Sequence, residues 1–129
     1  MQKLISSGSP WESKIGYSRA VVVNNMIFVS ASAATGDDGK VVSPDLYTQT
    51  RFVLDKLAGV LEDAGFSMAE VVSSRLSVSD FDNWSEATRA HGEVFAEVRP
   101  AFAIVHALPF IDPEILVEVE LVAVHSTDA

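Results

Sequence analysis

The C-terminal run EILVEVELVAVH, residues 114–125, constrains the fold of this chain more than any other segment. It alternates as a β-strand does, because successive side chains of a strand point to opposite faces of a sheet. One row is wholly apolar, as a helix-covered face requires: Ile115, Val117, Val119, Leu121 and Ala123. The other row mixes aliphatic side chains with carboxylates: Leu116, Glu118, Glu120, Val122 and Val124. This second row is too apolar for a free surface and too charged for a dry core, so it predicts a subunit interface or a ligand cleft.

Apolar periodicity predicts further elements upstream of this strand. Two short strands flank Asn24-Asn25 within residues 19–33, because asparagine tolerates the positive φ of a tight hairpin turn. A helix is predicted to start with Ser43 as its N-cap and Pro44 in its first turn, and to end at Gly65. The preceding segment SSGSPWES, residues 6–13, is predicted to be irregular.

The second half of the chain continues the alternation of strand and helix. In the predicted strand 71–78, one face is expected to hold Val72, Leu76 and Val78, and the other Ser73, Arg75 and Ser77. A second amphipathic helix starts near Trp84 and is stopped by Pro100, and a strand covers 101–107. The order β-β-α-β-α-β-β predicts an α+β fold, a mostly antiparallel sheet with both helices packed on one face. A length of 129 residues fits one domain, 1–129.

The amino-acid composition argues against several classes of binding partner and of catalytic chemistry. The net charge of -9 repels nucleic acid and anionic lipid. The chain has no long apolar run and no basic leader, so we expect a soluble, cytoplasmic protein with no membrane partner. Cysteine is absent, which excludes disulfides and thiolate chemistry. The three histidines lack metal-ligand spacing and no glycine-rich phosphate loop occurs, so no metal and no cofactor are predicted.

Several short motifs occur together in a specific order. They are GYSRAV, IFVSASA, TQTRFVLDKLAGVLEDAG, VVSSRLSVSD and the C-terminal pattern RPAF, LP and VEVELVAV. In this order and at these spacings the chain resembles the RidA/YjgF family of enamine/imine deaminases from Gly16 to about His125. The resemblance implies a chorismate-mutase-like homotrimer with clefts between subunits. It also implies hydrolysis of small imino or enamino acids to 2-keto acids and ammonium.

The resemblance also implies roles for individual positions. A tyrosine that lines the cleft matches Tyr17, and a glutamate that holds the attacking water matches Glu120. The arginine that forks onto the substrate carboxylate is replaced by Phe102. The usual serine-glycine of the second strand reads Ser30-Ala31. The chain is therefore identified as a divergent member that lacks the carboxylate-binding arginine.

The departures indicate a changed substrate site. Phe102, Ile104 and His106 share one strand face by their spacing of two, and we expect them to wall the cleft together with Ser30. Arg75 is the candidate replacement for the missing cation, and Arg19 is a second one, although either could be an ordinary surface arginine.

Two classes of function follow from this reading. The first is a deaminase-type hydrolase that acts on a small enamine, imine or related metabolite other than the usual 2-imino acids. Glu120 and Tyr17 are its expected catalytic residues, although Glu118 and Glu120 could instead form structural ion pairs. The second is a non-enzymatic homotrimer that binds a small-molecule ligand.

Overall fold

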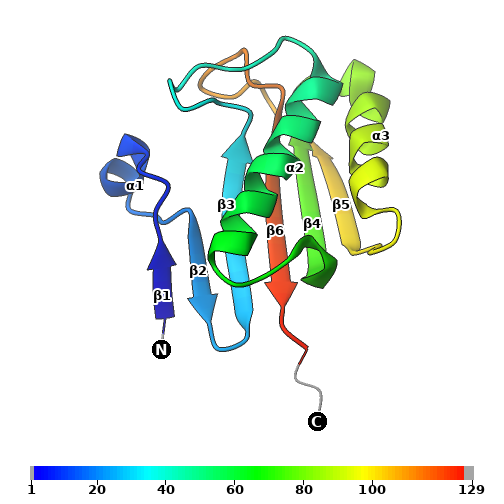
Figure 1. Cartoon of the computed structure of the whole chain (residues 1–129). Coiled ribbons are helices and arrows are strands. Elements are labelled where there is room, and N and C mark those ends of the chain that lie inside the picture. The colour runs from blue at the N-terminus through cyan, green and yellow to red at the C-terminus, as the bar shows by residue number, and fades with distance from the viewer. Residues whose placement is uncertain (1, 127–129) are drawn as a thin grey trace.

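The computed structural model describes residues 2–126 and contains one six-stranded sheet in the order β1-β2-β3-β6-β4-β5 (Figure 1). The strands are β1 (Gln2–Ile5), β2 (Ala20–Val23), β3 (Met26–Ala33), β4 (Val71–Val78), β5 (Ala101–His106) and β6 (Val117–Val124). The α-helices are α1 (Pro10–Ile15), α2 (Leu46–Asp63) and α3 (Trp84–Phe95), and the 3-10 turns are η1 (Met68–Glu70) and η2 (Phe81–Asn83). All strand pairs are antiparallel except β4 with β5. The predicted α+β fold is confirmed.

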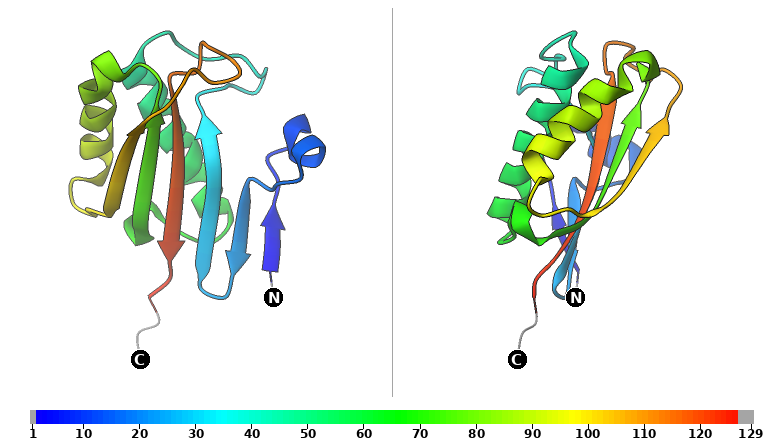
Figure 2. Two further views of the ribbon diagram at one scale, coloured as in Figure 1. Left: turned by 180° about the vertical axis from the view of Figure 1, so that it is seen from behind. Right: turned by 90° about the vertical axis from the view of Figure 1, so that its right-hand side faces the viewer.

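The long helices α2 and α3 pack on the same face of the sheet, as Figure 2 shows from the side. The core between these helices and the sheet is fully buried and aliphatic. It contains Ile27 from β3, Leu54 and Leu57 from α2, and Leu76 from β4. The opposite face, which we call the open face, has no helix over it (Figure 2). Among residues 2–126, no helix has the length and hydropathy that crossing a membrane would require.

The two faces of β6 differ as the sequence predicts. Val117, Val119, Leu121 and Ala123 are buried beneath the helices. The alternate row, which contains Glu118 and Glu120, lies on the open face, with Glu118 half-buried and Glu120 exposed. The sheet therefore presents a row of aliphatic and acidic side chains on the side that the helices leave uncovered.

The predicted hairpin turn and the predicted end of the first long helix are confirmed, and its predicted N-cap is wrong. The β2–β3 hairpin turns at Asn24, whose φ is 54°. The helix α2 ends just before Gly65, whose φ of 85° suits a residue without a side chain. Its N-cap is Asp45 and not Ser43, because the Asp45 carboxylate accepts a 2.8 Å hydrogen bond from the Thr48 backbone N–H.

Residues 2–15 contain structure that the periodicity did not reveal. The edge strand β1 pairs with β2, and the short helix α1 overlaps the segment 6–13 that was predicted to be irregular. Ser9 caps α1 and Pro10 starts it, which is the ordinary chemistry of a helix N-terminus. A six-residue helix and a four-residue strand are too short to show a clear apolar period.

The assignment of Val72 to the core face is wrong. The pairing of β4 with β6 shifts between Val71 and Ser73, so a β-bulge at Val72 places Val71 in the buried row and leaves Val72 47% exposed. Beyond the bulge, Leu76 and Val78 are buried as predicted. Arg75 alternates with Ser73 and Ser77 in the row of the open face.

Candidate functional site

A cleft of about 500 Å³ lies on the open face and crosses five strands. We call it the open-face cleft. Its lining consists of Val21, Phe28, Val29, Ser30, Ser73, Ser74, Arg75, Ala101, Phe102, Ala103, Glu120, Leu121 and Val122. Most of these residues are small or apolar, and the charged ones are Arg75 and Glu120. A concave surface that combines small apolar side chains with hydroxyls and a few charged groups can hold a small polar molecule.

Arg75 and Glu120 lie side by side in the cleft. They are direct partners in the antiparallel pairing of β4 with β6, so their side chains leave the sheet on the same face. Both are exposed. Within residues 2–126, neither takes part in an ion pair, and neither side chain is hydrogen-bonded. Their hydrogen-bonding capacity is therefore available to a ligand.

Glu118 is the second carboxylate of the same row. Burial raises the pKa of Glu118 above its ordinary value of 4.5, and the neighbouring negative charge of Glu120 adds to the rise, while the Arg19 guanidinium opposes it. A carboxyl with a raised pKa suits a proton carrier near neutral pH. This difference between Glu118 and Glu120 could not be predicted from the alternation of β6, because burial depends on the neighbouring strands.

Phe102 borders the open-face cleft, but its ring turns toward the helices. The parallel pairing of β5 with β4 matches Phe102 with Ser74, which belongs to the buried row. The ring centroid of Phe102 lies 4.6 Å from that of His91 on α3, and Phe102 is 43% exposed. At this position the chain places an aromatic contact with α3 and no cation.

The prediction that Ile104 and His106 wall the cleft is wrong. Paired with Leu76 and Val78, they lie on the helix-covered side of the sheet. Ile104 packs against the core, and the His106 ring stacks on Phe81 with centroids 4.7 Å apart. A spacing of two places Phe102, Ile104 and His106 on one face of β5. Whether that face is the open face or the helix-covered face depends on the pairing of β5 with β4.

Ser30 and Tyr17 lie at the border of a second, more open hollow. We call it the Tyr17 hollow, and its lining consists of Leu4, Glu12, Gly16, Tyr17, Ser18, Val21 and Ser30. Val21 and Ser30 line both hollows, so the Tyr17 hollow adjoins the open-face cleft. The Ser30 hydroxyl donates a 2.7 Å hydrogen bond to the Ser18 carbonyl. Tyr17 thus stands next to the cleft that holds Arg75 and Glu120, without lining it.

His91 has a structural explanation. It is 9% exposed, its Nε2 lies 2.7 Å from the Ser74 hydroxyl, and burial lowers its pKa from 6.5. The pair is enclosed between β4 and α3, so His91 is a core histidine with a hydrogen-bond partner. In the part of the chain that the structure describes, no group of three histidine or acidic side chains is arranged to hold a metal ion.

The fold and the cleft define a class of protein: a small sheet with two helices on one face and a ligand-sized cleft on the other. The family model described as endoribonuclease L-PSP matches residues 9–125. The crystal structure of Rv2704 from Mycobacterium tuberculosis, described as a member of the YjgF/YER057c/UK114 family, is 34% identical with a TM-score of 0.86, over 97% of this chain and 100% of that one. The chain belongs to this YjgF/Rid family.

Two sequence relatives agree with this assignment. The chain is 30% identical to the uncharacterized protein SCO2049 of Streptomyces coelicolor over 119 residues, which is 92% of this chain and 89% of that protein. It is 29% identical to the 3-aminoacrylate deaminase RutC of Acinetobacter baylyi over 108 residues, 83% of this chain and 85% of that protein.

Proposed function

We propose that the chain is a deaminase-type hydrolase that converts a small enamine or imine to a carbonyl compound and ammonium in the open-face cleft. The observation that carries the proposal is the cleft itself. It places Arg75 and Glu120 next to each other, with Glu118 in the same row, and no side chain among residues 2–126 engages the first two. In such a pair, the cation can bind an anionic substrate and the carboxylate can hold the water that attacks it.

The substrate class follows from the position of the charge. The relative named 3-aminoacrylate deaminase acts, by its name, on an enamine that carries a carboxylate. In this chain the cation of the cleft stands on β4, while the corresponding part of β5 presents Ala101, Ala103 and the edge of Phe102. A carboxylate held by Arg75 is therefore placed differently from one held at position 102. We infer a substrate other than the usual 2-imino acids.

The reaction needs no oxidant and no cofactor. An enamine first takes a proton on carbon and becomes an iminium ion. Water then adds to the iminium carbon while a glutamate takes its proton, which gives a carbinolamine. The same carboxyl returns the proton to nitrogen, and the C–N bond then breaks as the carbinolamine hydroxyl loses its proton. Ammonia leaves and takes up that proton as ammonium, with the carbonyl oxygen derived from water. Glu118, whose pKa is raised, and Glu120, which faces Arg75, are the two candidates for this proton transfer.

The homotrimer belongs to the same proposal. Phe28 is 43% exposed on the open face, where its strand partners are Val21 and Val122. Covering this apolar area with a second copy would remove water from the cleft and strengthen its electrostatic interactions. We propose that Tyr17 acts at the rim of this shared cleft as a hydrogen-bond donor to the substrate.

The paired variants Glu118→Gln and Glu120→Gln test the proposal. Glutamine keeps the size and most hydrogen bonds of glutamate but cannot take a proton, so the variant of the true base should lose about 100-fold or more in kcat. Ammonia release from imines made by an amino acid oxidase, and from 3-aminoacrylate, is the measurement. The other variant serves as the matched control and should lose much less.

Two outcomes would contradict the hydrolase. If both variants keep wild-type turnover, the carboxylates of the cleft are not the base. If the wild type binds small carboxylic acids without any turnover, the chain is a non-enzymatic ligand-binding protein. The endoribonuclease activity in the description of the family model is not part of the proposal, because a net charge of -9 opposes RNA binding.

A further inference from the structure

Arg19 is a buried cation that the proposed reaction does not yet use. It is 8% exposed, and every ion pair found within residues 2–126 is made by other residues. Removing a guanidinium from water is costly unless its hydrogen bonds are satisfied. In a chain with twice as many acidic as basic residues, 18 against 9, a buried arginine without an ion-pair partner requires an explanation.

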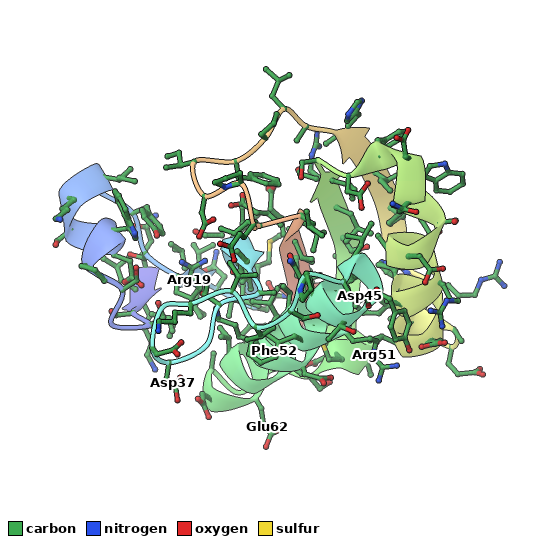
Figure 3. The ribbon with its side chains drawn as sticks, turned by 90° about the horizontal axis from the view of Figure 1, so that it is seen from above. Arg19, Asp37, Asp45, Arg51, Phe52 and Glu62 are labelled. Atoms are coloured by element: carbon green, nitrogen blue, oxygen red, sulfur yellow. The ribbon has the colours of Figure 1, made fainter. Side chains whose placement is uncertain are left out.

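The contacts of Arg19 all lie next to the site. Nη1 donates to the Ala31 carbonyl at 2.9 Å and to the Ser32 hydroxyl at 2.7 Å, and Nη2 donates to the Tyr17 phenol oxygen at 3.3 Å. The guanidinium carbon lies 5.5 Å from the centre of the Tyr17 ring. The Nε atom is buried with no partner. In Figure 3, Arg19 lies between α1 and the end of β3.

The segment that Arg19 holds is irregular. The pairing of β3 with β6 shifts between Val29 and Ser32, so Ser30 and Ala31 form a bulge opposite Glu120. Ser30 lines the open-face cleft, and Tyr17 lines the hollow beside it. One guanidinium thus connects the bulge of β3 with the phenol at the rim of the cleft.

Arg19 also acts on Glu118 through its charge. It opposes the rise in the pKa of Glu118 that burial and Glu120 cause. The other charged groups near Arg19 are Glu12, whose pKa it helps to lower, and Lys56, whose pKa it helps to lower as a like charge. Glu12 accepts hydrogen bonds from Ser6 and Ser7, so it is already engaged.

We propose that Arg19 is a positioning residue of the site: it fixes Tyr17 and the β3 bulge beside the open-face cleft and supplies positive charge to Glu118, which shares the row of Glu120 on β6. The inference rests on the proposed function for its catalytic meaning. The hydrogen bonds and the charge of Arg19 are properties of the chain whether or not the reaction takes place. Arg19 is a positioning residue and not a catalytic one, because it contacts Tyr17 and the β3 bulge and does not line the open-face cleft.

The variants Arg19→Gln and Arg19→Lys separate the two parts of this role. Glutamine removes the charge, so the titration midpoint of Glu118, followed by carbon-13 NMR of the side-chain carboxyl, should move upward. Lysine keeps the charge but not the forked geometry, so the midpoint should stay near the wild-type value. If the wild type is active, both variants should lower kcat by about tenfold, because Tyr17 is no longer held. Only Arg19→Gln should also move the acidic limb of the pH–rate profile upward.

Lys14→Gln is the control, since Lys14 is exposed and its neighbour is Trp11. It should change neither the Glu118 midpoint nor kcat. A Glu118 midpoint that is unchanged in folded Arg19→Gln overturns the inference, and so does a midpoint in Arg19→Lys that moves as far as in Arg19→Gln. The NMR titration needs no substrate, so a wild type without turnover removes the proposed function while the titration still decides the role of Arg19.

Discussion

At the scale of single residues, the central fact is that Arg75 and Glu120 are neighbours without being bound to each other. They face each other across β4 and β6, and both are exposed. An exposed pair of this kind gains little by closing into a salt bridge in water. Inside a covered cleft, the same pair would bind an anion and a water molecule on adjacent strands.

Arg75→Ala should weaken the binding of small carboxylates without loss of folding. A charge-assisted hydrogen bond contributes about 1.5–3 kcal/mol, so the dissociation constant should rise by about 10- to 100-fold. Isothermal titration with a panel of small carboxylic acids measures this change. Lys40→Ala is the control, because Lys40 is exposed and lies outside both hollows. Equal affinity in wild type and Arg75→Ala would exclude Arg75 as the anion-binding residue.

The placement of Arg75 was predictable, and that of Ile104 and His106 was not. Arg75 follows from the alternation of β4, whose hydroxyl-rich row is evident in the sequence. For β5, the alternation gave the correct grouping, but the choice of face depends on a parallel register with β4. The roles predicted for Tyr17, Ser30 and Glu120 remain predictions.

At the scale of elements, the buried pair of Ser74 and His91 joins β4 to α3. The hydroxyl and Nε2 lie 2.7 Å apart, and the His91 ring also contacts Phe95 and Phe102. Ser74 lies in the buried row together with Leu76 and Val78, and this brings its hydroxyl to His91. Alternation along β4 places Ser74 in that row but does not show which helix residue it meets, so the link was not predicted.

The stability of the chain should depend on the protonation of His91. Burial lowers the pKa of folded His91 below 6.5, so between that lower pKa and pH 6.5 the unfolded state binds more protons than the folded state. The stabilisation is complete above pH 6.5 and is lost as the pH falls toward the folded pKa. The free energy of unfolding should decrease by at most about 1.4 kcal/mol per pH unit from this group.

Urea unfolding of the wild type and of His91→Gln from pH 7.5 to 5 isolates this effect. Glutamine can still bond Ser74 but does not titrate, so the difference between the two curves should shrink as the pH falls below 6.5. Carboxylates contribute equally to both proteins and cancel. Parallel curves over the whole range would show that His91 does not titrate on unfolding.

The helix α2 was predictable from the sequence, except for its cap, and the elements β1 and α1 were not. The helix α2 has a long apolar stripe and a glycine just after its end, and its range came out within a few residues. Its cap was misplaced because Ser43, Pro44 and Asp45 all carry helix-start chemistry, and only the 2.8 Å bond to Thr48 distinguishes Asp45. The edge strand β1 and helix α1 are too short for a periodic signal.

At the scale of the whole molecule, the sheet has one face packed under helices and one face without cover (Figure 2). The row of Glu118 and Glu120 on β6 predicted this asymmetry, and the fold agrees with it. What the row cannot specify is the partner that covers it, because complementarity depends on the shape of both surfaces. We propose a second copy of the chain in a homotrimer, which would close the open-face cleft.

The central claim is that the open-face cleft hydrolyses an enamine or imine and is complete only in the assembled protein. Ammonia release per chain should therefore be measured over a dilution series in which mass photometry gives the fraction of trimer in each sample. We expect the rate per chain to fall in proportion to the fraction of trimer and to exceed spontaneous hydrolysis only where trimer is present. Monomers with the full rate, or intact trimers with no rate above spontaneous hydrolysis, would contradict it.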